Sequence, residues 1–153
     1  MNKHSKIFVA GHRGLVGSAI VRTLKKRGYV NIITITRDEV DLVNQKQVEN
    51  FFAQERPEYV FDAAARVGGI YANDHYSGEF IYQNMQIQAN LIHYAWKYEV
   101  QKFLFLGSVC IYPKYAEVPV KEESLLTGYL EPTNDAYAVA KISGIKMLQA
   151  YNK

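Results

Sequence analysis

The sequence has 153 residues, which is enough for one domain of ordinary size. Hydrophobic residues make up 48% and charged residues 22%, a globular balance that argues against long disordered segments. The net charge is only +3 and the basic residues are scattered, so nucleic acid is not expected as a partner. The single cysteine, Cys110, excludes a disulfide framework and a CxxC metal site, and we expect no metal.

No apolar run approaches the roughly 18 residues that a membrane span requires. The N-terminal residues lead into a short apolar run that is interrupted at Gly11, which is unlike a secretory signal. We therefore expect no membrane partner and a cytoplasmic location.

Short apolar runs predict strands, and the longer amphipathic stretches between them predict helices. The runs are continuous rather than alternating, as in strands buried on both faces of a parallel sheet. In chain order we expect a strand at 7–10, a helix at 14–27, a strand at 31–36, a helix at 44–55, a strand at 59–63, a helix at 79–98, a strand at 102–106 and a helix at 135–151. This order predicts an α/β fold with a doubly wound parallel sheet of the Rossmann type.

Two stretches, residues 66–78 and 108–134, are expected to be irregular. Each follows the carboxyl end of a predicted strand, which is where α/β sheets bind ligands. Loops of this length inside a compact α/β domain are usually functional.

Glycines recur with G-x-x-G-x-x-G spacing at Gly11, Gly14 and Gly17, directly after the first strand and at the start of the first helix. Glycines there permit a tight turn and close approach of the backbone to a pyrophosphate, which the helix N-terminus attracts. The segment from Gly11 to Gly17, which also contains Leu15 and Val16, is therefore a candidate dinucleotide site. The alternative is a tight turn without a ligand.

Two arginines bear on which dinucleotide is bound. An NAD enzyme usually carries an acidic residue about 20 positions after the glycines, to bind the ribose 2′-hydroxyl. Arg37 stands there instead, and Arg13 lies within the glycine loop. Two guanidiniums suit a 2′-phosphate, which favours NADPH. Two surface arginines are the alternative, and the neighbouring Asp38 leaves NAD open.

Further residues are candidates for the edge of the cofactor site. Asp41 and Leu42 follow the second strand and could border the adenine. Ala63 and Ala65 end the third strand with side chains small enough for a cofactor to lie against the backbone. Close core packing explains these alanines almost equally well.

Tyr137 and Lys141 form a Y-x-x-x-K pattern on a predicted helix, where residues four apart are neighbours. The lysine charge favours the phenolate, so this tyrosine could exchange a proton with a carbonyl or an alcohol. A second match, Tyr98 and Lys102, falls across a helix end and a strand. Ser108 follows the fourth strand and could bind the same oxygen. A surface Tyr–Lys pair is the alternative.

Cys110 stands two residues after Ser108. A lone cysteine is often a small buried hydrophobic residue. Its position in the presumed substrate loop makes a role as nucleophile or base equally plausible.

The chain resembles the GDP-L-fucose synthase family of extended short-chain dehydrogenases/reductases. The resemblance covers nearly the whole sequence. It rests on residues 10–18, 36–39, 67–70, 80–85, 106–113 and 131–134 and on the helix that follows.

The resemblance implies a multifunctional NADPH enzyme, an isomerase and oxidoreductase that acts on a GDP-sugar. Such an enzyme epimerises GDP-4-keto-6-deoxy-D-mannose beside its ketone and then reduces the ketone to give GDP-L-fucose. It also implies a homodimer through the long third helix and the Tyr137 helix. Four apolar residues of the long helix could supply the surface, namely Ile81, Met85, Ile92 and Trp96, and a role in the core is the alternative for them. The alternatives are another nucleotide-sugar epimerase or reductase and a dinucleotide-binding domain without turnover.

The resemblance also implies residue roles. Tyr137 is the acid for reduction, assisted by Lys141 and Ser108, and Cys110 is the epimerisation base. Arg13 and Arg37 are the contacts to the 2′-phosphate.

Two departures from the family accompany these roles. Val109 replaces a second serine that is common after the catalytic one. The family's catalytic histidine, its last strands and its C-terminal substrate domain lie beyond Lys153. We therefore expect residues 1–153 to form an incomplete NADP-binding domain with little turnover of its own.

Overall fold

The computed structural model describes all residues from Met1 to Lys153. The chain forms two compact units. The first comprises Met1–Ala65 and Gln86–Leu106, and the second comprises Arg66–Met85 and Gly107–Lys153. A single domain over residues 1–153 stays a prediction.

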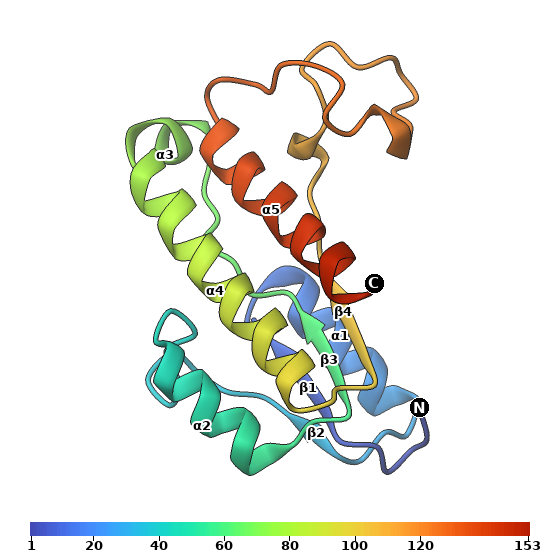
Figure 1. Ribbon diagram of the computed structural model, residues 1–153. Coiled ribbons are helices and arrows are strands. Elements are labelled where there is room, and N and C mark those ends of the chain that lie inside the picture. The colour runs from blue at the N-terminus through green and yellow to red at the C-terminus, as the bar shows by residue number, and fades with distance from the viewer. The chain divides into compact units, whose positions relative to one another are not determined.

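The first unit contains a sheet of four parallel strands (Figure 1). The strands are β1 (Ile7–Ala10), β2 (Ile32–Ile33), β3 (Tyr59–Asp62) and β4 (Lys102–Phe105), in the order β2-β1-β3-β4. The chain moves outward from β1 to β2 and then crosses back to β3 on the other side of β1. The carboxyl ends of β1 and β3 therefore form the switch point at which such sheets bind ligands. The predicted doubly wound Rossmann-type sheet is confirmed.

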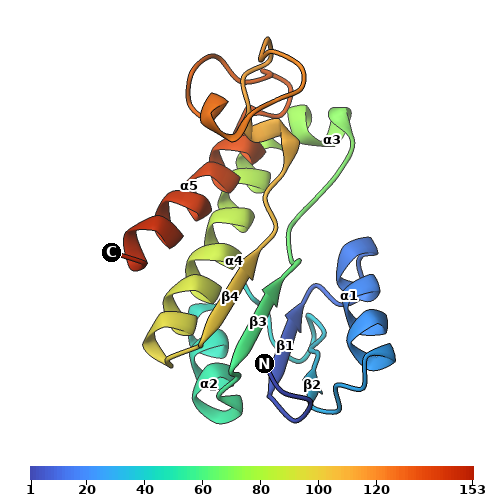
Figure 2. The ribbon, with the colours of Figure 1, turned by 90° about the vertical axis from the view of Figure 1, so that its right-hand side faces the viewer.

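Helices cover both faces of this sheet (Figure 2). On one face α1 (Leu15–Lys26) packs its Leu24 against Ile7 and Val9. On the other face α2 (Gln45–Glu55) and the C-terminal part of α4 (Ser77–Lys97) pack around Phe8. All four residues of β1 are completely buried, which explains why the strand is continuously apolar. Burial of each large side chain contributes about 1.5–3 kcal/mol.

The second unit is mainly helical. It contains α3 (Ile70–His75), the first part of α4, the short 3₁₀ helices η1 (Val109–Ile111) and η2 (Glu122–Ser124), and α5 (Asp135–Tyr151). The η1 turn packs against α5. None of the helices is both long enough and apolar enough to cross a membrane.

The second strand is much shorter than expected. Only Ile32 and Ile33 pair with β1, rather than the predicted 31–36. A local turn follows at residues 37–39, and there the carboxylate of Glu39 accepts the Thr36 backbone N–H. The third and fourth strands each end one residue before the predicted boundary.

The prediction of an irregular stretch at 66–78 is wrong for residues 70–75, which form α3, and for residues 77 and 78, with which α4 begins. Asn73 stabilises its start by donating from Nδ2 to the carbonyls of Gly68 and Gly69, at 2.8 and 3.1 Å. The stretch 108–134 contains the two short 3₁₀ helices. The expected helix at 135–151 is confirmed, and those at 14–27, 44–55 and 79–98 are present with ends shifted by one or two residues.

Candidate functional site

The glycine loop lies against the ends of β1 and β3. Gly11 has a positive φ of 73°, and a Cβ there would collide with the carbonyl oxygen of Ala63. A Cβ on Gly17 would collide with the carbonyl oxygen of Gly11. The chain can pass this closely only with glycine at both positions. The predicted tight turn is therefore present, and its ligand role stays a prediction.

The first turn of α1 is open to a ligand. Gly14 is the N-cap and supplies no side-chain acceptor, so the first-turn N–H groups are not capped by it. The next side chain, Leu15, is 88% exposed, and Val16 is also exposed. This end of the helix combines free donors with the positive end of the helix dipole, an arrangement that suits a phosphate.

Glu39 organises the turn after β2, and the sequence analysis did not assign it a role. Its carboxylate accepts from the Thr36 backbone N–H at 2.6 Å and from the Thr36 hydroxyl at 2.9 Å. These bonds, the backbone one first, lower the pKa of Glu39, and the nearby charges of Arg13 and His12 add to the effect. The Thr-x-x-Glu spacing was the signal that could have revealed this turn. Arg13 is thus near enough to influence the carboxylate of Glu39.

The two candidate 2′-phosphate ligands are exposed. The Arg37 side chain is 72% exposed, and its Nε lies 3.9 Å from an oxygen of Asp41, which is a loose ion pair. Arg13 is also exposed. Both guanidiniums are accessible to an anion, and Asp38 is exposed beside them.

The turn at Asp41 and Leu42 is held from two sides. The Asp41 N–H donates to Gln47 Oε1 at 2.7 Å. Asn90 of α4 donates from Nδ2 to the carbonyls of Leu42 and Val43, at 2.8 and 3.2 Å. These bonds keep the two candidate adenine-side residues in a fixed place within the first unit.

The alanines after β3 continue the sheet edge beside the glycine loop. Ala63 N–H donates to the carbonyl of Ala10 at 3.1 Å, and Ala64 N–H donates to the carboxylate of Asp62 at 3.0 Å. Asp62 is completely buried, and its structural role was not predicted. Ala63 and Ala65 are half-buried, and their contact with a cofactor stays a prediction.

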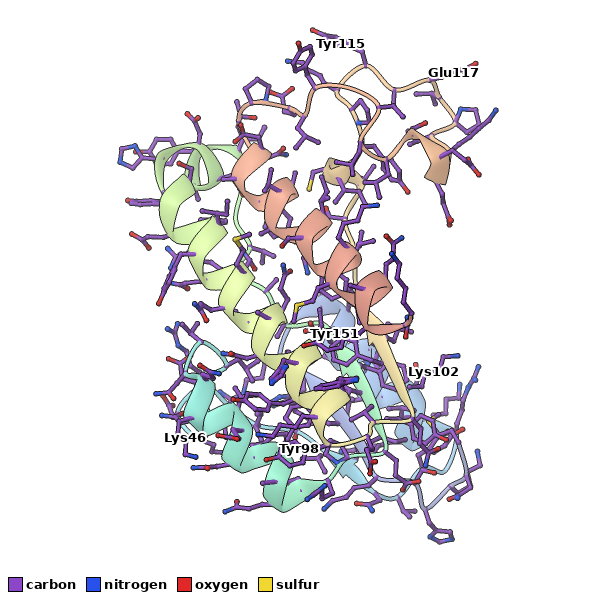
Figure 3. The ribbon with its side chains drawn as sticks, in the orientation of Figure 1. Lys46, Tyr98, Lys102, Tyr115, Glu117 and Tyr151 are labelled. Atoms are coloured by element: carbon purple, nitrogen blue, oxygen red, sulfur yellow. The ribbon has the colours of Figure 1, made fainter.

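Lys141 is only 4% exposed, which rules out the surface-pair alternative for Tyr137 and Lys141. Lysines are almost never fully buried unless their charge has a partner. Tyr137 lies one turn earlier on α5. The competing pair lies on different elements, as predicted: Tyr98 follows α4 and stacks on Phe52, and Lys102 is exposed on β4 (Figure 3).

Ser108 and Cys110 are in direct contact. The Cys110 thiol donates to the Ser108 hydroxyl oxygen, with the sulfur and oxygen 3.1 Å apart. Ser108 is the N-cap of η1, the turn that packs against α5. The second unit therefore brings the segment with the serine and cysteine against the helix with Tyr137 and Lys141. The intervening Val109 is exposed, so its side chain does not disturb this contact.

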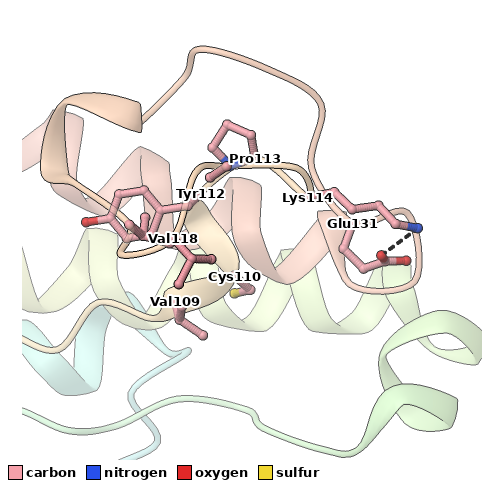
Figure 4. Close-up of a pocket in the computed structure, with 9 residues that line it drawn as sticks. Val109, Cys110, Tyr112, Pro113, Lys114, Val118 and Glu131 are labelled. Atoms are coloured by element: carbon pink, nitrogen blue, oxygen red, sulfur yellow. Dashed lines mark ion pairs between the residues drawn. The ribbon is translucent and has the colours of Figure 1, made fainter.

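A cavity of about 280 Å³ opens beside Cys110 (Figure 4). Its lining is mostly apolar and consists of Val109, Cys110, Tyr112, Pro113, Lys114, Ala116, Val118, Val120 and Glu131. The Lys114 ammonium lies 2.8 Å from the Glu131 carboxylate. Their hydrogen bond lowers the pKa of Glu131 and raises the pKa of Lys114. The sequence patterns gave no sign of this pair.

Comparison with known proteins identifies the family. Residues 7–153 match the model of the NAD-dependent epimerase/dehydratase family. The chain belongs to this family.

Close relatives confirm the resemblance to GDP-L-fucose synthases. The chain is 59% identical over 150 residues to GDP-L-fucose synthase 1 of Arabidopsis thaliana, with 98% of this chain and 46% of that protein covered. It is 55% identical over 148 residues to the GDP-L-fucose synthase of Escherichia coli K12, with 97% and 46% covered. The chain thus spans about half the length of these relatives.

A solved structure shows the same backbone. The fold superimposes with a TM-score of 0.96 and 45% identity on a GDP-mannoheptose C4 reductase from Campylobacter jejuni with NADP bound. The match covers 99% of this chain and 48% of that one.

Proposed function

We propose that residues 1–153 supply the cofactor-binding and acid–base groups of an NADPH-dependent enzyme. This enzyme epimerises and reduces GDP-4-keto-6-deoxy-D-mannose to GDP-L-fucose. The observation that carries the proposal is the buried Lys141 one turn from Tyr137, on the helix against which the Ser108–Cys110 turn packs. The names of the close relatives and the NADP in a related structure support it.

The first unit fits a dinucleotide phosphate. A Cβ at Gly11 or Gly17 would collide with neighbouring backbone atoms, so the loop depends on glycine at both positions. The uncapped N-terminus of α1 lies within this loop. The exposed guanidiniums of Arg13 and Arg37 would hold a 2′-phosphate, which NADH lacks. When bound, NADPH supplies the hydride for the reduction.

The second unit fits the proton transfers. A ketone acidifies the hydrogens on its neighbouring carbons, so the Cys110 thiolate can remove one of them as a proton. Inversion then requires a second acid that gives a proton back on the opposite face, and the resemblance implies a histidine beyond Lys153 for that role. Tyr137 protonates the carbonyl oxygen during reduction. It thereby becomes a phenolate, which the Lys141 charge stabilises. The Ser108 hydroxyl binds the same oxygen and stabilises its developing charge. One oxygen-binding site therefore serves both reactions.

A reductase for another GDP-sugar is the second candidate. It is favoured by the 45% identity to the GDP-mannoheptose C4 reductase, whose named substrate differs from the deoxy sugar proposed here. Turnover of the two ketosugars, measured side by side, distinguishes these candidates. A dinucleotide-binding domain without turnover predicts NADPH binding and no product from either.

The mechanism is tested with Cys110→Ser and Tyr137→Phe in a protein that carries residues 1–153 and turns over the substrate. Cys110→Ser should slow deuterium uptake from solvent at the epimerised carbons while reduction of an epimerised ketone survives. Tyr137→Phe should slow reduction by about 10²–10⁴-fold. Tyr98→Phe, in the other Tyr-x-x-x-Lys match, is the control and should change neither rate. Unaltered deuterium uptake in Cys110→Ser would show that the cysteine is not the base.

We also propose that the enzyme forms a homodimer through α4 and α5. Exposed apolar side chains support this, namely Met85 and Trp96 on α4 and Val139 on α5, of which Trp96 is 58% exposed. Ile92 is buried and does not contribute to this surface. Sedimentation at micromolar concentration tests the proposal, and a monomer contradicts it.

We propose a cytoplasmic location as well, and recovery of the protein in a secreted fraction contradicts it.

A further inference from the structure

Glu131 lies between the segment that carries Cys110 and the helix that carries Tyr137. On one side its carboxylate binds the ammonium of Lys114 at 2.8 Å, and Lys114 follows Cys110 by four residues. On the other side the same carboxylate accepts from the hydroxyl of Thr133, with the two oxygens 3.3 Å apart. The Glu131 backbone carbonyl accepts from the N–H of Asn134 at 3.1 Å.

The two segments are paired beyond this residue. The Lys114 N–H donates to the Tyr129 carbonyl at 2.8 Å. Gly128 lies so close to Pro113 that an added Cβ would be 3.2 Å from the proline ring. Asn134 is the N-cap of α5, and its carbonyl accepts from the Ala138 N–H at 3.0 Å. The contacts therefore run continuously from the end of η1 to the first turn of the Tyr137 helix.

This location gives Glu131 a part in placing the thiol. Cys110 and Glu131 line the same cavity, with the Lys114–Glu131 pair at its edge (Figure 4). The thiol must be placed to within about 1 Å to act on a substrate carbon, because larger errors cost orders of magnitude in rate. The long loop, residues 107–134, contains only two short 3₁₀ turns and cannot supply that precision from secondary structure.

We propose that Glu131 is a positioning residue: its contacts with Lys114 and Thr133 fix Cys110 relative to the helix that carries Tyr137. This inference rests on the proposed function for its catalytic consequence. The positioning itself is testable without turnover, because Cys110 is the sole cysteine of the chain and its alkylation reports on one atom.

The experiment measures the rate of Cys110 alkylation by iodoacetamide as a function of pH. The variants are Glu131→Gln, Lys114→Met and the exchange Lys114→Glu/Glu131→Lys. Glu117→Gln is the control, because it removes the same charge from an exposed site of the same loop (Figure 3). Positioning predicts that both single variants raise the high-pH plateau rate by roughly threefold or more, because the loop opens more often. The exchange should return the plateau toward the wild-type rate, and the control should not move it.

A pure charge effect gives a different result. Removing the negative charge of Glu131 would favour the thiolate, and removing the positive charge of Lys114 would disfavour it. The two single variants would then shift the pH midpoint in opposite directions and leave the plateau unchanged. That result, or a plateau that the charge exchange fails to restore, overturns the positioning role.

A second readout uses the reaction. In a protein that turns over the ketosugar, Glu131→Gln should lower kcat for deuterium exchange more than kcat for reduction, with little change in KM. Equal losses in both rates would contradict a role directed at Cys110. If the wild-type protein shows neither reaction, the proposed function fails, and the alkylation profile still decides whether Glu131 positions the thiol.

Discussion

The side chain of Asn84 forms hydrogen bonds with both the backbone N–H and the backbone carbonyl of Arg66. Its Oδ1 accepts the Arg66 N–H at 2.9 Å, and its Nδ2 donates to the Arg66 carbonyl at 3.0 Å and to the Phe80 carbonyl at 2.8 Å. Asn84 is only 2% exposed, so these bonds are formed away from water. The side chain therefore does for residue 66 what a neighbouring strand would do for a residue in a sheet.

Asn84→Leu should destabilise the protein by about 2 kcal/mol or more, because it leaves two backbone groups of Arg66 without a protein partner. Asn84→Asp keeps the acceptor but loses the Nδ2 donor, so it should cost less at a pH where its carboxyl is protonated and can donate to the Arg66 carbonyl than where it is ionised. Gln83→Leu, which changes the neighbouring amide on α4, is the control. Urea unfolding measures all three variants, and equal midpoints for Asn84→Leu and Gln83→Leu would contradict the prediction.

Gly11→Ala and Gly28→Ala separate backbone strain from close packing. Both glycines have positive φ, 73° and 78°, but a Cβ at Gly28 meets open space. Gly28→Ala should cost about 1–2 kcal/mol, the penalty of the left-handed conformation. Gly11→Ala should cost about 1–3 kcal/mol more, because its Cβ also collides with the Ala63 carbonyl. Unfolding free energies measure the difference, and similar values for the two variants would argue against the close approach.

Arg37→Ala should weaken NADPH binding selectively. Loss of a hydrogen bond to a charged phosphate costs about 1.5–3 kcal/mol, which is roughly 10- to 150-fold in Kd. NADH has no 2′-phosphate, so its affinity should hardly change. Arg27→Ala, at the opposite end of α1, is the matched control. Isothermal titration with both cofactors tests this, and equal wild-type affinities for NADPH and NADH would refute the assignment.

The stability contribution of Glu49 should depend on pH. Its carboxylate bonds Lys97 of α4 at 2.7 Å and Lys46 of α2 at 3.1 Å. The bond to Lys97 and then that to Lys46 lower the pKa of Glu49 below its usual 4.5, and the bond to Glu49 raises the pKa of Lys97 above its usual 10.5.

The lowered carboxyl pKa means that the stabilisation is present above pH 4.5 and is lost as the pH falls through the folded-state value. The raised lysine pKa means that it is present below pH 10.5 and is lost as the pH rises through that folded-state value. The Tm difference between the wild type and Glu49→Gln should therefore be largest between these limits and shrink outside them. High salt should reduce it, because the pair is near the surface. A difference independent of pH would mean that packing, not charge, is lost.

Local sequence patterns predicted the buried strands, the glycine turn and the helix that carries Tyr137 and Lys141. The continuous apolar runs predicted the buried strands, since a strand covered on both faces has no polar side. The glycine spacing predicted the turn after β1, because only a residue without a Cβ fits where Gly17 meets Gly11. Helical spacing separated the Tyr137–Lys141 pair from the Tyr98–Lys102 match, since only the first pair lies on one helix.

Tertiary structure decided what those patterns could not. Hydrophobic runs do not show that β2 pairs with β1 over only two residues, or that the Glu39 side chain organises the turn that follows. A Y-x-x-x-K spacing does not show whether the lysine is buried, and Lys141 is buried on a helix that packs against the η1 turn. The bonds of Asn84 to Arg66 join residues 18 apart, and the Lys114–Glu131 pair joins two ends of one loop. Local sequence determines backbone preference, whereas burial and partners arise only when distant segments meet.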